Sequence, residues 1–74
     1  MTDEELYDHY YQEKLSHLRH TPSIGKTMVK AWISSLNAQD RSDYSNSQRV
    51  TAQAIIDAYK QRLAEFQTLE LLDH

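Results

Sequence analysis

Residues 46–71 read NSQRVTAQAIIDAYKQRLAEFQTLEL and contain neither glycine nor proline. Apolar side chains recur in this segment every three or four residues, the spacing of one face of an α-helix. Ser45 and Gln48 match a capping box, which marks a helix start near Asn46. We therefore predict one helix of about 25 residues, roughly 37 Å long at 1.5 Å per residue. Its apolar face is expected to comprise Ala52, Ile55, Ile56, Tyr59, Leu63 and Phe66.

A second helix is predicted over residues 3–19. Thr2 and Glu5 form a capping-box pair, and acidic residues fill the first turn, where the positive end of a helix favours them. Arg19 and His20 bring positive charge to the last turn. Tyr7, Tyr11, Leu15 and Leu18 fall on one face, with Leu6 and Tyr10 beside it.

The segment between these two helices predicts a third, over residues 22–36. Thr21 is suited to cap it, and Pro22 is suited to the first helical position, where its missing N–H needs no partner. Its apolar residues cover roughly half of the helix circumference, more than the stripe of an ordinary surface helix. We infer that this helix is central in the fold, or that one of its sides meets another chain. Residues 37–46 are polar and predict a loop.

These segments predict a single all-α domain over residues 1–74, with two shorter helices and a long C-terminal one in an antiparallel bundle. Glycine and proline occur once each, too rarely for a chain of many turns. Cysteine is absent, so disulfides cannot support so small a core. Very regular helices, a metal or oligomerisation remain as supports, and an oligomer is expected.

The long helix is predicted to be longer than its neighbours can cover. Its C-terminal end would then expose Leu69, Leu71 and Leu72, and exposed apolar patches usually mark interaction sites. The alternative is that these last residues are frayed and have no binding role.

Composition and charge argue against several functional classes. The net charge is −3, so no basic surface for nucleic acid or anionic lipid is expected. No apolar run approaches the roughly 20 residues of a membrane span. The first residues are acidic where a signal peptide would be basic, so a cytoplasmic location is expected. No motif joins a nucleophile to a base, so neither enzymatic activity nor a cofactor is expected.

The function that we predict is a small cytosolic protein–protein interaction module, acting as an inhibitor, adaptor or regulator of a larger protein. Tryptophan is enriched at interface hot spots and methionine adapts to varied partners. Trp32 has two alternative roles, as an anchor of the core or as part of an interface. The residues expected to bind a protein partner are Tyr10, Met28, Val29, Trp32, Ile33, Leu69, Leu71 and Leu72.

Two other functions are considered beside this one. A transcriptional or nucleic-acid-associated regulator would need Lys26, Lys30, Arg41 and Arg49 to share one surface.

A metal or pH sensor is a weaker hypothesis. His9, Glu13 and His17 are spaced by four residues on the first helix, and His20 follows three residues later. Imidazoles one turn apart can chelate a transition metal and titrate near neutral pH. Without cysteine or a second carboxylate cluster, a histidine-rich solvated face is the simpler interpretation.

Overall fold

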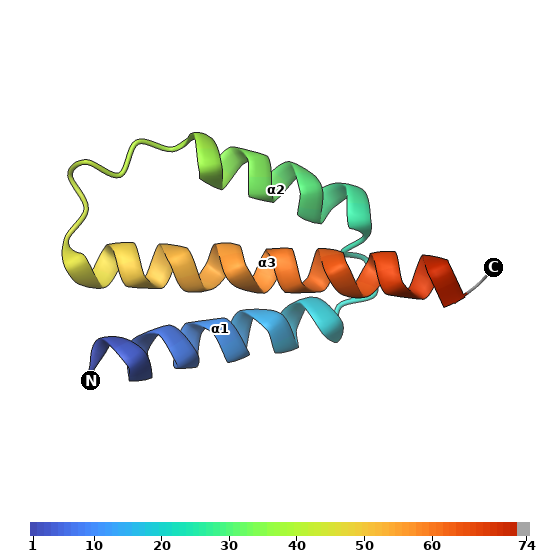
Figure 1. Cartoon of the computed structure of the whole chain (residues 1–74), viewed down its shortest axis with the longest axis horizontal. Helices are drawn as coiled ribbons and strands as arrows, with labels where there is room; N and C mark the ends of the chain where they lie inside the picture. Colours follow the sequence, from blue (N-terminus) through green and yellow to red (C-terminus); the bar gives the residue numbers. More distant parts are fainter. Residues whose placement is uncertain (73–74) are drawn as a thin grey trace.

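The structure is a computed structural model that describes residues 1–72. Within that range the chain forms three helices and no strand: α1 over Asp3–Arg19, α2 over Lys26–Ala38 and α3 over Asn46–Leu72 (Figure 1). The predicted all-α class is confirmed.

Capping boxes begin both α1 and α3. The Glu5 amide donates to the Thr2 hydroxyl over 3.2 Å, and the Glu5 carboxylate accepts from the Thr2 amide over 3.3 Å. At α3, the Gln48 amide donates to the Ser45 hydroxyl over 3.2 Å, and the Ser45 amide donates to the Gln48 side chain over 2.8 Å. Each pair satisfies backbone donors that the first helical turn leaves free.

α2 begins at Lys26, not at Pro22 as predicted. The reason lies in Thr21, whose hydroxyl donates to the His17 carbonyl over 2.7 Å. Thr21 therefore stabilises the end of α1 instead of capping the next helix. Gly25 occupies the N-cap of α2 in an extended conformation and provides no side-chain cap.

α2 also ends later than predicted, at Ala38, which leaves residues 39–45 as the connection to α3. The Arg41 guanidinium donates to the Leu36 carbonyl over 2.6 Å. A cation placed on the last carbonyls of a helix stabilises that end, where the helix dipole is negative.

The central element is α3, so the first alternative for the helix of residues 22–36, a central position, is wrong. The second alternative, that one of its sides meets another chain, stays a prediction. Figure 1 shows α1 and α2 on opposite sides of α3, with α1 parallel to it and α2 running in the opposite direction. α1 and α2 each pack against α3 and do not pack against each other. The 27 residues of α3 span about 40 Å, against about 25 Å for the 17 residues of α1. The molecule measures 44 × 25 × 19 Å, and its long dimension follows α3.

Polar contacts fix the register of α1 on α3. The Asn46 amide donates to the Asp3 carboxylate over 2.9 Å at one end, and Arg19 pairs with Glu65 at the other. On the other side of α3, Lys26 at the start of α2 pairs with Glu70 over 2.9 Å.

The core is small and includes residues outside the predicted apolar face of α3. Ala54 and Ala58 are completely buried, on the side of α3 that also carries Asp57, the partner of Tyr7 on α1. Alanine lets α1 approach closely, and a pair of alanines adds little to a hydrophobic pattern. The buried apolar residues of the described chain are Leu15, Leu18, Val29, Ala54, Ile56 and Ala58.

Candidate protein-binding groove

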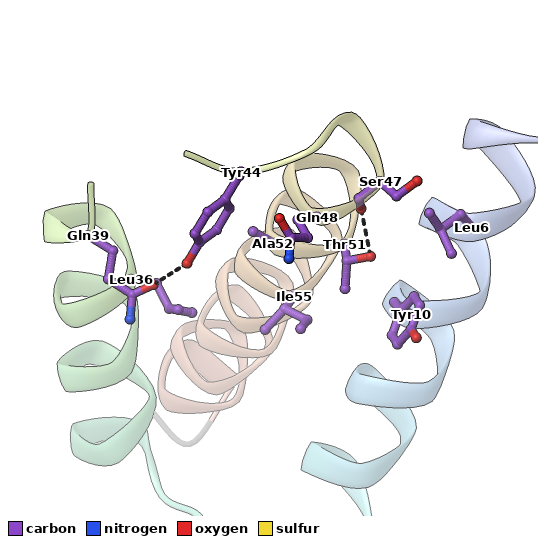
Figure 2. Close-up of a pocket in the computed structure, with 10 residues that line it drawn as sticks. All are labelled: Leu6, Tyr10, Leu36, Gln39, Tyr44, Ser47, Gln48, Thr51, Ala52 and Ile55. Carbon is purple, nitrogen blue, oxygen red and sulfur yellow. Dashed lines mark hydrogen bonds between the residues drawn. The ribbon is translucent and has the colours of Figure 1, made fainter. Parts of the chain in front are cut away.

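An open hollow lies between α1 and α2, with α3 as its floor. It has a volume of about 600 Å³. Figure 2 shows Leu36 from α2, Ile55 from α3 and Tyr10 from α1 around the same space. Tyr44 from the α2–α3 connection closes one end. The full lining is Leu6, Tyr10, Leu36, Gln39, Tyr44, Ser47, Gln48, Thr51, Ala52 and Ile55.

A second hollow of about 300 Å³ continues the first along α3. The two share Leu36 and Ile55 in their lining. We call the combined feature the groove. Between Gln48 and Tyr59 its floor follows about 16 Å of helix axis at 1.5 Å per residue. The second hollow is lined by Lys14, Trp32, Ser35, Leu36, Ile55 and Tyr59.

Helical spacing explains why these side chains line up. Leu6, Tyr10 and Lys14 are four residues apart and so form one row along α1. Ile55 and Tyr59 continue the row on α3 that starts at Thr51. The groove stays open because α1 and α2 contact opposite sides of α3, and neither covers the row between them.

The far end of the groove is aromatic. The Trp32 and Tyr59 rings lie with centroids 5.6 Å apart at an interplanar angle of 40°. Burial raises the pKa of the Tyr59 phenol above its ordinary value. The Lys14 ammonium stands 5.9 Å from the centroid of the Tyr59 ring, within reach of a cation–π interaction. This end therefore offers large apolar area together with one positive charge.

Within residues 1–72, the lining of the groove carries no acidic side chain. No aspartate or glutamate of this range lines either hollow. Among the lining residues, Lys14 is the one with a formal charge at pH 7. The groove is thus neutral to weakly positive on a protein that is negative overall.

The structure divides the predicted partner-binding residues of α1 and α2 between surface and core. Tyr10 and Trp32 line the groove, so Trp32 contributes to packing against Tyr59 and also remains partly accessible. Met28, one turn before Trp32, is 42% exposed. The prediction that Val29 binds a partner is wrong, because this side chain is 0% exposed and packs inside the chain. Ile33 follows Val29 by one turn and is only partly accessible.

The predicted exposure at the end of α3 is confirmed. Leu69 is 52% exposed, and Leu71 and Leu72 are each 76% exposed. We call these three residues the C-terminal leucines. They lie in the last turns of α3, which extend past the α1–α2 connection (Figure 1).

Several groove residues were not identified from the sequence. Tyr44 was assigned to a polar loop, Gln48 was identified only as part of a capping box, and Thr51 is a polar residue without a motif. A large aromatic residue between polar neighbours was the one available signal. Its position over the groove depends on tertiary contacts, since its hydroxyl lies 3.5 Å from Gln39 at the end of α2 and its carbonyl accepts from Arg49 over 3.3 Å.

The histidine-rich face of α1 does not assemble a metal site. His9 and Glu13 approach to 3.1 Å. His20 is engaged elsewhere, since its Nδ1 lies 2.7 Å from the Ser16 carbonyl. Across residues 1–72, no three histidine, cysteine or carboxylate side chains gather as potential ligands, so His17 also has no such group to join.

The basic residues considered for nucleic-acid binding do not form one surface. Arg41 and Arg49 share a polar hollow on the α2–α3 connection with Ser42 and Gln53. Both arginines donate to backbone carbonyls there, which secures the connection. Lys26 is at the opposite end of α2 and is paired with Glu70.

No helix within residues 1–72 combines the length and the apolar character needed to cross a membrane. The groove and the C-terminal leucines are two apolar surfaces of the described chain to which a function can be attached. Comparison of the chain with protein-family models, curated proteins and solved structures gives no match.

Proposed function

We propose that this chain is a small protein-binding module that acts as an inhibitor, adaptor or regulator of a larger protein through the groove. The observation that carries the proposal is the continuous, carboxylate-free groove between α1 and α2, with Trp32 and Tyr10 in its walls. Partly exposed aromatic side chains beside aliphatic ones have the composition of interface hot spots.

The shape of the groove favours a macromolecular partner over a small ligand. Sites for small molecules bury most of the ligand surface, which needs a closed cleft. This groove is open, and α1 and α2 do not pack against each other, which leaves the part of α3 between them uncovered. Domains normally bury such a face against a second layer. A partner protein would supply that layer.

The lining of the groove supports binding more than catalysis. It offers hydroxyl and amide groups, such as Ser47 and Gln48, but no histidine, cysteine or carboxylate to act as a base or nucleophile. We propose that the module works in the cytoplasm, which the absence of cysteine suits. We also propose that it self-associates through the C-terminal leucines, because their apolar surface lies outside the groove.

Site-specific photo-crosslinking in host extract tests the role of the groove. A photoreactive amino acid replaces Ser35, an exposed residue on the groove wall, and in a matched variant replaces Lys60, an exposed residue of α3 outside the groove lining. We expect the Ser35 probe to give a discrete adduct that the Lys60 probe does not give. Ile55→Glu should abolish the adduct while helix content, measured by circular dichroism, stays unchanged. An identical adduct from both probes, or one that survives Ile55→Glu, would contradict the proposal.

A further inference from the structure

The geometry points to the class of partner: we propose that the groove receives an amphipathic α-helix of about three turns from a different protein, with a carboxylate that pairs with Lys14. This inference rests on the proposed function and adds the chemistry of the bound segment.

The dimensions and walls of the groove favour a helix. About 16 Å of floor between Gln48 and Tyr59 corresponds to about three helical turns at 5.4 Å each. Apolar side chains of a partner at positions i, i+4 and i+7 would contact Ala52 in the first hollow, Ile55 and Leu36 where the two hollows join, and the Trp32 ring in the second. The small side chain of Ala52 leaves room for close approach on the α2 side of the floor.

An extended peptide finds little to pair with here. Strand addition depends on free backbone donors and acceptors at a sheet edge. The groove walls and floor are helices, whose backbone groups are already paired internally. A helical partner also satisfies its own backbone and needs only side-chain contacts, which is what the groove offers.

The positive charge of Lys14 favours partner helices that carry a carboxylate. Lys14 is the one formal charge in the lining, and it stands at the aromatic end beside Tyr59. Arg62, further along α3, is already paired with Glu65 over 3.1 Å. A carboxylate in the partner's turn nearest Trp32 would therefore meet an ammonium group that has no ion pair among the described residues.

The same charge argues against a second copy of this chain facing the groove. Two grooves placed face to face would each contribute a Lys14 and no carboxylate, and like charges at close range oppose association. The complementary partner is a helix with the opposite charge, which a groove-to-groove dimer does not supply.

Selection of helical peptides tests the inference. A displayed library of 14-residue peptides, apolar at i, i+4 and i+7, without tryptophan and with all other positions randomised, is selected on the full chain and on Lys14→Glu. We expect acidic residues to be enriched at one helical position on the wild type and basic residues at that position on the variant. Trp32 is the one tryptophan of the chain and lines the groove, so its fluorescence reports the affinity of each selected peptide.

We expect Lys14→Glu to lower the affinity for the acidic peptide about fivefold, which is the scale of an exposed ion pair replaced by repulsion. Replacing the peptide's acid by lysine should recover binding to the variant. Lys60→Glu is the same charge reversal outside the groove, and it should leave the affinity for the acidic peptide unchanged.

Other outcomes overturn the inference in distinguishable ways. Selected peptides that stay non-helical when bound, or that bind wild type and Lys14→Glu equally, refute the acidic helix. If no peptide binds while the Ser35 crosslink persists, the proposed function stands and the helical partner is refuted. Sedimentation showing a dimer that Ile55→Glu dissociates would assign the groove to a second copy.

Discussion

Met28 and Val29 are neighbours on α2, but one is exposed and the other is buried. Truncation of Val29 should therefore lower the stability of the fold, and truncation of Met28 should change it little. Val29 is 0% exposed and Met28 is 42% exposed. Val29→Ala removes two methyl groups from the core, at about 0.8 kcal/mol each for lost burial. A cavity of roughly 50 Å³ that does not collapse would add about 1.2 kcal/mol at 24 cal/mol per Å³. The free energy of unfolding should therefore fall by about 1.6–2.8 kcal/mol.

Met28→Ala removes a side chain that water already reaches, so we expect the free energy of unfolding to change by no more than about 0.5 kcal/mol. Urea unfolding followed by circular dichroism measures both variants against the wild type. In thermal unfolding, the Val29 variant should melt roughly 6–22 °C lower, given about 4–8 °C per kcal/mol for a domain of this size. Equal losses for the two variants, or a larger loss for Met28, would refute the packing of α2 described above.

Three further predictions concern titration and assembly. The hydrogen bond from Arg19 lowers the pKa of Glu65 to about 2; the stability from this ionised carboxylate is fully present above about pH 4.5 and is lost as the pH falls toward 2. Glu65→Gln should remove that part of the acid sensitivity in urea titrations, and an unchanged pH profile would contradict the pairing. The hydrogen bond with Asp57, 2.5 Å long, raises the pKa of Tyr7 to about 12. The stability that this bond contributes is present below pH 10 and is lost as the pH rises through 12. Tyr7→Phe should therefore flatten the profile of stability against pH between these values. The chain should sediment as a dimer or larger species at micromolar concentration, and Leu71→Lys should shift it toward the monomer; a wild-type monomer of 8.7 kDa would refute self-association.

The existence of the three helices follows from local patterns. Both capping boxes join residues three positions apart, and hydrophobic periodicity acts within a few turns, so neither needs the rest of the fold. Local reasoning failed at Thr21, because its hydroxyl could serve either the helix before it or the helix after it. The structure shows that it bonds to the His17 carbonyl of α1, which delays the start of α2 to Lys26.

Pattern alone also gave only part of the candidate site. Tyr10 and Trp32 were expected to contact a partner, and both line the groove. Tyr44 was missed, because a loop residue reaches the groove only when α2 and α3 are in place.

The sequence by itself determined three amphipathic helices and the capping boxes of α1 and α3, because these depend on neighbours about one turn away. The lengths of the helices also indicated the exposure of the C-terminal leucines. Only the tertiary structure decided which faces met. α1 and α2 pack on opposite sides of α3, and Ala54, Ala58 and Val29 are buried in this packing. The hydrophobic effect is non-directional, so an apolar stripe specifies burial without specifying a partner. The groove exists because both shorter helices took opposite sides of α3 and left the row through Ile55 uncovered.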